Sequence, residues 1–193
     1  MHKQYGAQSN VCALGFEPNP RHHERLKKIE KYYLEKGFKV HFFPFAVSDR
    51  DEEVLFYTSD SSKNEYRRAR MFKVPSKKTN AIVPVPFPVP AIRFATFIKK
   101  VLYGVQVKLM KMDIEGAEYR VLTDLLHQGL LCQKHIGAIM LEVHPSVIHT
   151  LAPKYKGSFK LLYDDIAAQD CNATELLDFD DETFLHDVRD SLR

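Results

Sequence analysis

The chain has 193 residues, with 28 basic and 25 acidic residues and a formal net charge of +3. This length and the apolar content fit one domain, residues 1–193, with a hydrophobic core. The basic residues are scattered at helical spacing, so solvated helix faces explain them more simply than a nucleic-acid surface does. No apolar run reaches the length of a membrane span, and the polar N-terminus has no signal-peptide core.

Cysteine usage bears on the compartment in which the chain works. The three cysteines, Cys12, Cys132 and Cys171, are odd in number and form no CxxC pair. Such a pattern indicates neither a zinc site nor a disulfide framework. We therefore predict a reducing compartment, the cytoplasm.

The first apolar run covers residues 11–17 and ends in Glu17, just before Pro18 and Pro20. Proline bars the continuation of a central strand, so Glu17 is expected at the carboxyl tip of a strand. A carboxylate at that place can accept hydrogen bonds from both hydroxyls of a ribose. The alternative is a helix N-cap, a role that Asn19 can fill instead.

A helix and a second strand follow. Apolar residues form a stripe over residues 21–36, and Gly37 supplies a stop, so a helix is predicted there. Residues 39–47 predict a strand with Ala46 at its tip. Such a small side chain could let a flat base approach the backbone, whereas the alternative is an ordinary core alanine.

The next part of the chain is irregular. Residues 53–57 predict a short strand, and the polar residues 58–80 predict a long surface excursion. Residues 82–90 alternate valine with proline, which favours an extended edge segment over an internal strand. Residues 94–101 predict a short helix.

Residues 107–126 carry the strongest local signal. An apolar run leads into three carboxylates around Gly116, and a helical apolar face follows, which predicts a strand, a tight turn and an amphipathic helix. In open parallel α/β sheets, ligands bind at the carboxyl ends of the strands. We therefore predict a functional role for Asp113. Glu115 and Glu118 could merely complement the positive helix N-terminus, and for Glu118 we favour that interpretation.

A further apolar strand is predicted over residues 137–143, with Glu142 and His144 at its end. Histidine changes protonation near neutral pH, so His144 can serve as a general base. A histidine that orders the turn before Pro145 is the alternative.

The rest of the chain continues the alternation of strands and helices. Residues 147–151 and 159–168 predict helices, and residues 173–179 and 182–185 predict terminal strand pieces. Alternating strands and helices of this kind indicate an α/β domain with a largely parallel sheet.

Four segments, GFEPNP, FPFAVSD, KMDIEGAEYRVL and IMLEVHP, occur in this order. In sequence and spacing they resemble the FkbM-type family of S-adenosylmethionine-dependent methyltransferases, over about residues 11–145. The resemblance implies a Rossmann-like methyltransferase fold, with helices on both faces of a largely parallel sheet. It also implies S-adenosylmethionine as the cofactor and O-methylation of a hydroxyl on a sugar, a glycan or a small metabolite.

The same resemblance assigns roles to residues at the predicted strand tips. Glu17 would bind the ribose of the cofactor, and Phe45 and Ala46 would lie beside the adenine. Asp113 would face both the methyl donor and the acceptor. The implied catalytic set comprises Asp113, Glu115, Glu142 and His144. No metal site is predicted, because the chain alone does not show that these carboxylates converge on an ion.

One departure from the family pattern is large. The family's first strand and glycine-rich turn normally precede the GFEPNP segment, whereas only residues 1–10 precede Val11, and no GxG occurs. The chain thus resembles a member truncated at its N-terminus, with the first strand and helix missing. The alternative function is accordingly a non-catalytic remnant or binding module, which keeps the fold without a working donor site.

The missing strand would lie at the centre of the sheet. We expect the strands that end at Glu17, Ala46, Asp113 and Glu142 to lie in one sheet, with their tips converging on one cleft. The strands flanking the gap would each keep an unpaired edge, which predicts self-association with a second chain.

Overall fold

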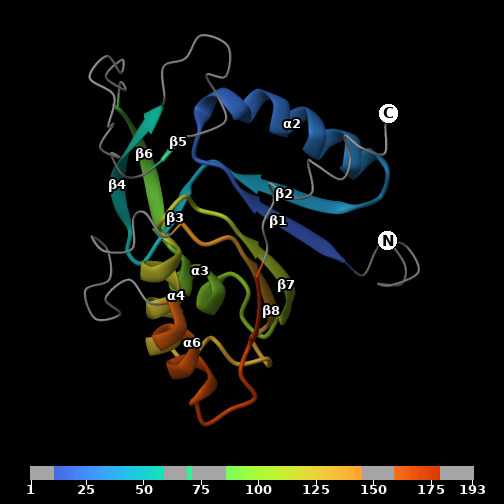
Figure 1. Ribbon diagram of the computed structural model, residues 1–193. Helices are drawn as coiled ribbons and strands as arrows, with labels where there is room; N and C mark the ends of the chain where they lie inside the picture. The colour runs from blue at the N-terminus through green and yellow to red at the C-terminus, as the bar shows by residue number, and fades with distance from the viewer. Residues whose placement is uncertain (1–10, 59–68, 71–85, 145–158, 179–193) are drawn as a thin grey trace, which may run out of the picture.

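The structure is a computed structural model that describes residues 11–58, 69–70, 86–144 and 159–178 (Figure 1). It is a mixed α/β arrangement. Its described strands are β1 (Cys12–Phe16), β2 (Lys39–Phe43), β3 (Ala46–Ser48), β4 (Glu52–Thr58), β5 (Ala69–Arg70), β6 (Pro86–Arg93), β7 (Val107–Met112), β8 (Ile136–Leu141) and β9 (Glu175–Asp178). Its described helices are α2 (Pro20–Glu35), α3 (Phe94–Lys100), α4 (Glu118–His127) and α6 (Phe159–Ala167).

The described strands form three sheets, in the orders β1-β2, β3-β6-β4-β5 and β7-β8-β9. The prediction of a single sheet is therefore wrong, but most of the described strand pairs are parallel, as predicted. The β1-β2 pair and all pairs of the third sheet are parallel, whereas β4 runs antiparallel to both β5 and β6. The strand that ends at Glu17 and the strand that ends at Asp113 consequently belong to different sheets.

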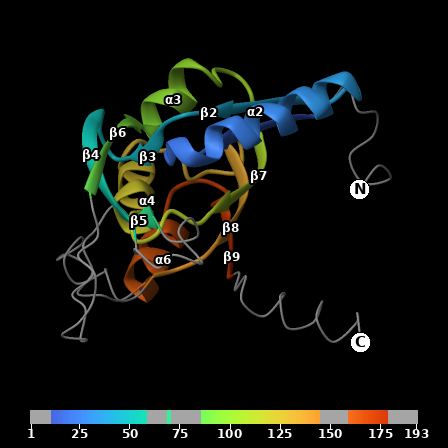
Figure 2. The ribbon, with the colours of Figure 1, turned by 90° about the horizontal axis from the view of Figure 1, so that it is seen from above.

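Helix α2 connects the two strands of the first sheet and confirms the predicted helix. It begins at Pro20, and the side chain of Asn19 accepts a hydrogen bond from the backbone N–H of Arg21 at 3.1 Å. Gly37 follows the helix with a φ of 81°, a conformation that glycine adopts without a steric penalty. Figure 2 shows α2 running alongside β2.

The predicted continuous strand over residues 39–47 is divided. Strand β2 ends at Phe43, and after Pro44 the chain enters β3, which pairs with β6 in the second sheet. Proline has no backbone N–H to donate to a ladder, so it marks a natural break between the two strands. Phe45 lies in the bend, and Ala46 becomes the first residue of β3 rather than the tip of β2.

Strand β6 carries the described part, residues 86–90, of the proline-rich segment predicted over residues 82–90. In the sheet order it lies between β3 and β4, but β3 pairs only from Ala91 onward. Alternate residues of a strand direct their backbone groups to the same side, so the nitrogens of Pro88 and Pro90 face one side of β6. Neither nitrogen carries a hydrogen, so this side cannot donate hydrogen bonds to a neighbouring strand at these residues. The proline part of β6 therefore has the predicted edge character, whereas its last residues are internal.

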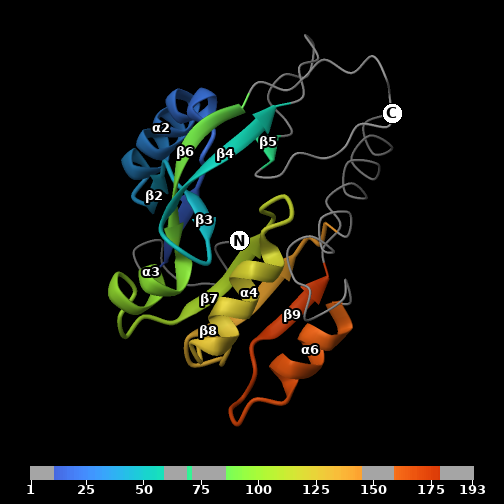
Figure 3. The ribbon, with the colours of Figure 1, turned by 90° about the vertical axis from the view of Figure 1, so that its left-hand side faces the viewer.

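The third sheet shares a hydrophobic core with the helices α3, α4 and α6. Figure 3 shows α4 and α6 lying beside the β7-β8-β9 sheet, with α2 further away next to β2. The core residues with no exposed surface are Val121, Leu122 and Leu125 of α4, Leu131 of the following loop, Ile136, Ile139 and Leu141 of β8, and Leu162 of α6. Each large apolar side chain buried in this way stabilises the fold by about 1.5–3 kcal/mol relative to exposure.

Close contact within this sheet depends on one glycine. A Cβ atom added at Gly137 would lie 2.7 Å from the backbone oxygen of Lys108, which is too close for any other residue. The glycine therefore lets β8 approach β7 in the observed register, in which Met112 pairs with Leu141. This register sets the two strand ends side by side.

Charged side chains connect the second sheet to α4. Arg120 contacts Asp49, and it also donates a hydrogen bond to Glu52 at 3.0 Å. Burial raises the pKa of Asp49, but the hydrogen bond and the charge of Arg120 outweigh this effect and lower the pKa overall. Arg93 binds Asp124 of α4 through two hydrogen bonds of 2.9 and 2.6 Å.

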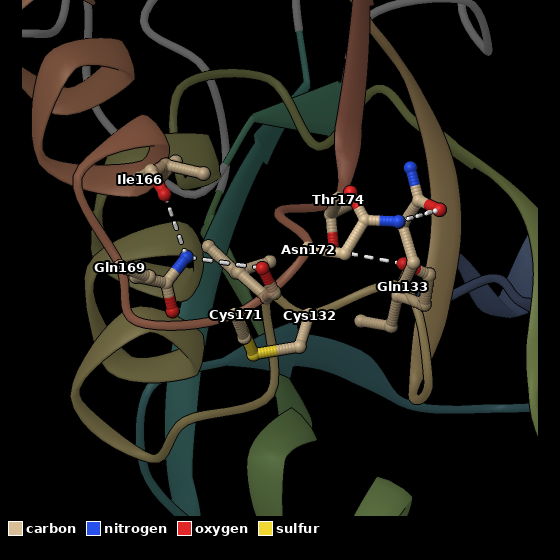
Figure 4. The surroundings of a disulfide bond; sticks show 9 residues. Cys132, Gln133, Ile166, Gln169, Cys171, Asn172 and Thr174 are labelled. Carbon is tan, nitrogen blue, oxygen red and sulfur yellow. Dashed lines mark hydrogen bonds between the residues drawn. A yellow bond between two sulfur atoms is a disulfide. The ribbon is translucent and has the colours of Figure 1, made fainter.

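A disulfide joins Cys132 to Cys171, with their Cα atoms 5.9 Å apart and a sequence separation of 39 (Figure 4). The cysteine pattern, which indicated no disulfide framework, therefore gave no sign of this bond. Beside it, the side-chain amide of Gln169 donates to the carbonyl oxygens of Leu131 at 3.0 Å and Ile166 at 2.8 Å. The disulfide thus fastens the connection between α6 and β9 to the connection between α4 and β8. Cys12 is a free, exposed cysteine.

Other predictions have mixed outcomes. Helices α3 and α6 and strand β9 confirm the predicted elements at residues 94–101, 159–168 and 173–179. Most of the predicted surface excursion lies outside the described residues, and its described parts are Thr58, at the end of β4, and β5. The predicted helix at 147–151 and strand piece at 182–185 also lie outside them. Within the described part of the chain, no helix combines the length and apolarity that a bilayer span requires.

Candidate functional site

The turn between β7 and α4 positions the first site residues. It contains Asp113, Ile114 and Glu115, and the predicted tight turn at Gly116 is confirmed by a φ of 104°. Glu115 has a φ of 53°, a conformation that costs a residue other than glycine about 1–3 kcal/mol. The turn holds this conformation because its backbone amides are bound from within the fold.

Glu118 supplies that binding. It is the first residue of α4 and is 1% exposed. Its Oε1 atom accepts hydrogen bonds from the backbone N–H groups of Ile114 at 3.0 Å and Gly116 at 3.1 Å. A buried carboxylate is stable only when it has such partners. Glu118 therefore does more than complement the helix N-terminus, the role that the sequence analysis favours for it. It also holds the turn through two hydrogen bonds.

His144 brings the two strand ends together. It lies just beyond β8, and its Nδ1 atom is 3.0 Å from Oε1 of Glu118. Its Nε2 atom faces three further carboxylates, at 3.6 Å from Glu115, 3.8 Å from Glu142 and 4.0 Å from Asp113. The side chain of His144 is only 15% exposed. The predicted acceptor-side set is thus assembled around one imidazole.

This surrounding charge changes the proton affinity of the histidine. The hydrogen bond with Glu118 raises the pKa of His144 most strongly, burial acts in the opposite direction, and the charges of Glu118, Glu115 and Asp113 raise it further. The net effect is a raised pKa. In its neutral form, the imidazole can accept a proton or bind a cation at Nε2.

Glu17, the predicted ribose ligand, lies in a different environment. Its two carboxylate oxygens are engaged near the start of α2, where Oε1 accepts from the backbone N–H of Asn19 at 2.8 Å and Oε2 is 3.2 Å from Nδ1 of His22. Its carbonyl oxygen is 2.8 Å from Nε2 of His23. Asn19 rather than Glu17 is the N-cap of the helix, and Glu17 accepts a hydrogen bond from the backbone of this capping residue.

Of the two predicted adenine-side residues, Ala46 lies against the β7-α4 turn. Phe45 is half-buried, and Ala46 is 2% exposed. Ala46 belongs to a small hydrophobic cluster that includes Ala117, with Ile114 packed against it. Ala46 is therefore a core alanine in this structure, and its contact with an adenine stays a prediction.

Glu118 is the residue of this site whose role the sequence interpretation missed, although the sequence holds a signal for it. Val121, Leu122 and Leu125 form the apolar face of α4, and Glu118 precedes them by three, four and seven residues. It is thus a carboxylate on the buried face of an amphipathic helix. A charge at such a position is rarely tolerated unless it has partners, so the spacing itself could have indicated a polar network.

The geometry agrees with the comparison of the chain with known families. The family model for the Methyltransferase FkbM domain matches residues 1–155. No curated protein and no solved structure matches the chain. The match spans both strand ends that carry the acidic residues and the histidine, and it covers most of the chain. This protein therefore belongs to the FkbM family of methyltransferases.

Proposed function

We propose that this domain transfers a methyl group from S-adenosylmethionine to a hydroxyl of a sugar, a glycan or another small metabolite. Membership of the FkbM methyltransferase family supports the reaction class. The observation that carries the acceptor assignment is the convergence of Asp113, Glu115 and Glu142 on His144, at the adjacent carboxyl ends of β7 and β8. Such strand ends are where α/β folds bind their ligands.

In this proposal the residues divide into two groups. Asp113 and His144 are catalytic, because one orients the acceptor hydroxyl and the other takes its proton. Glu115 and Glu142 line the acceptor side and hold polar groups of the substrate. S-adenosylmethionine supplies an electrophilic methyl group on a sulfonium sulfur. Glu118 is a positioning residue, since it acts through its hydrogen bonds to the turn and to His144.

The residues proposed to bind S-adenosylmethionine are less well arranged for that role than the residues proposed to bind the acceptor hydroxyl. Glu17 would have to exchange Asn19 and His22 for the ribose hydroxyls. No GxG occurs in the 193-residue sequence to bring backbone amides close to the methionine portion of the cofactor. Phe45 and Ala46 are the proposed adenine contacts, and Ala46 lies against the β7-α4 turn.

Calorimetric titration with S-adenosylhomocysteine tests the proposal. We expect binding that is weaker than micromolar, because the chain lacks the glycine-rich turn. Glu17→Ala should remove charge-assisted hydrogen bonds worth about 1.5–3 kcal/mol, which corresponds to a loss of about 10- to 150-fold in affinity. Glu24→Ala is the matched control, because Glu24 is an exposed acid on α2 whose ion pair is with Lys27. No binding by the unchanged chain would favour the alternative, a binding module without a donor site.

The disulfide is evidence about the cellular compartment of the protein. Disulfides persist in oxidising compartments and are rare in the cytosol. The pairing of Cys132 with Cys171 therefore favours an oxidising compartment over the cytoplasm that the sequence predicted.

We also propose that a second copy of the chain associates through the open sheet edges. Among the described strands, β1 pairs only with β2, and β7 pairs on one side only, with β8. Unpaired edges recruit further strands. Leu14 of β1 and Leu109 of β7 are exposed, and α2 has no buried residue, so apolar surface accompanies both edges.

Sedimentation velocity at micromolar concentration checks this association. We expect a dimer or larger species that binds a hydrophobic dye, and Leu109→Lys should shift it toward the monomer, because an edge lysine opposes pairing. Leu161→Lys on α6 is the matched control, since Leu109 and Leu161 are both 46% exposed. A monomeric wild-type chain with one cooperative melting transition would contradict the proposal.

A further inference from the structure

We propose that Asp113, Glu115 and His144 form a binding site for a divalent transition-metal ion such as Mn²⁺ or Zn²⁺. One ligand atom from each of these residues lies within 4.8 Å of the other two. The sequence predicted no metal site, because its carboxylates are spread over separate strand ends. The fold brings them together with an imidazole, and this combination of ligands is the basis of the inference.

The imidazole distinguishes this site from an ordinary group of acidic residues. His144 comes from the end of β8, whereas Asp113 and Glu115 come from the turn after β7. Nε2 of His144 is turned toward both carboxylates, at 4.0 Å from Asp113 and 3.6 Å from Glu115. Imidazole nitrogen suits Mn²⁺ less than Zn²⁺, and carboxylate oxygen suits both ions. A mixed nitrogen and oxygen set therefore selects this class of cation over Ca²⁺, which takes oxygen ligands.

A further carboxylate, which is not one of the proposed ligands, orients the histidine. Nδ1 of His144 is 3.0 Å from Glu118, whose side chain is 1% exposed. Metal-binding histidines usually donate their other ring N–H to a carboxylate or carbonyl, which fixes the tautomer and directs the free nitrogen at the metal. Glu118 gives His144 this arrangement, and it also holds the turn that carries the two acidic ligands.

The two carboxylates need to move only slightly toward the imidazole when the ion binds. Ligand atoms at about 2.0–2.2 Å from a tetrahedral metal lie about 3.4 Å from one another. The separations from His144 Nε2, 3.6 and 4.0 Å, are slightly longer than this value. Glu142, at 3.8 Å from the same nitrogen, or a water molecule can take the fourth position.

An ion at this place would also act on the acceptor. Metal coordination lowers the pKa of a bound hydroxyl and orients it. With the ion bound, Nε2 of His144 is a ligand, so the ion would activate the acceptor hydroxyl in place of that nitrogen, and the hydroxyl proton would pass to solvent. This role rests on the proposed function. The binding of the ion itself does not, because it depends only on the three ligands.

The test is a titration of the metal-free full chain with Mn²⁺, followed by the electron paramagnetic resonance signal of the free ion and by calorimetry. We expect one equivalent to bind and to raise the melting temperature, since a ligand that binds only the folded state stabilises it. His144→Asn should lower the affinity for Mn²⁺ by about 10- to 100-fold. Asparagine can still donate a hydrogen bond to Glu118 but has no counterpart of Nε2. Asp113→Asn should have a similar effect.

His41→Asn is the matched control, because His41 also pairs with a carboxylate, Glu30, at 3.2 Å. It should leave Mn²⁺ affinity unchanged. Should His144→Asn fail to fold, Asp113→Asn decides the matter, since the Asp113 side chain is 33% exposed. Undetectable binding by the unchanged chain, or equal binding by it and Asp113→Asn, would overturn the site.

Parallel titration with S-adenosylhomocysteine separates this inference from the proposed function. Binding of Mn²⁺ without binding of S-adenosylhomocysteine would support the metal site and count against methyl transfer. The reverse result would count against the metal site alone.

Discussion

Asp113→Asn is expected to lower methyl-transfer turnover by about 10²- to 10⁴-fold, the usual contribution of a positioned acid or base. Asp113 lies at the end of β7, 4.0 Å from His144, and its side chain is a third exposed. Its replacement should therefore change the free energy of unfolding by less than about 1 kcal/mol. Release of S-adenosylhomocysteine, measured with a panel of mono- and disaccharide acceptors, gives the turnover.

His144→Asn should cause a comparable loss of turnover, because it removes Nε2 while asparagine can still donate to Glu118. Asp164→Asn on α6 is the control, since Asp164 pairs with Lys160 on the surface. Melting curves of all three variants separate a catalytic defect from unfolding. Turnover equal to that of the unchanged protein in both site variants would mean that other residues carry the reaction.

Loss of the disulfide should produce the largest effect on stability. The Cys132–Cys171 bond closes a loop with a sequence separation of 39. For a loop of this size, chain-entropy arguments give a stabilisation of about 3–4 kcal/mol. Cys171→Ser should therefore lower the melting temperature by about 6–16 °C for a chain of this length, measured by calorimetry under non-reducing conditions.

Two controls identify the cause of that loss. Cys12→Ser should melt like the unchanged protein, because Cys12 is exposed and free. A reducing agent should destabilise the unchanged protein by a similar amount but should not destabilise Cys171→Ser further. If the reductant has no effect on the unchanged protein, the two cysteines are not bonded in solution.

Several elements could be predicted from the sequence because their signals are local. Helix α2 follows from an apolar stripe between Asn19 and Gly37, and both residues act within one turn of the helix. The turn at Gly116 and the helix after it follow in the same way from residues adjacent in the chain. The four segments that resemble the methyltransferase family, taken in their order, also sufficed to indicate that family, which the match over residues 1–155 confirms.

The division into three sheets was decided by tertiary structure. The apolar character of residues 39–47 predicted one strand, but Pro44 separates β2 from β3, and each finds a different partner. The pairing of strands depends on which surfaces meet after the chain folds, and hydrophobic periodicity reports only that a segment is extended.

The site itself combines both kinds of information. The sequence determined that Asp113, Glu142 and His144 stand at strand ends, because apolar runs end at those residues. Only the tertiary structure placed His144 against Glu118, 26 residues earlier in the chain, and joined Cys132 to Cys171. Local patterns arise from residues within a few positions of one another, whereas these contacts depend on the register of β7 with β8 and the docking of α6. Neither the register nor the docking has a signal in any short segment, because both are set by the packing of the whole core.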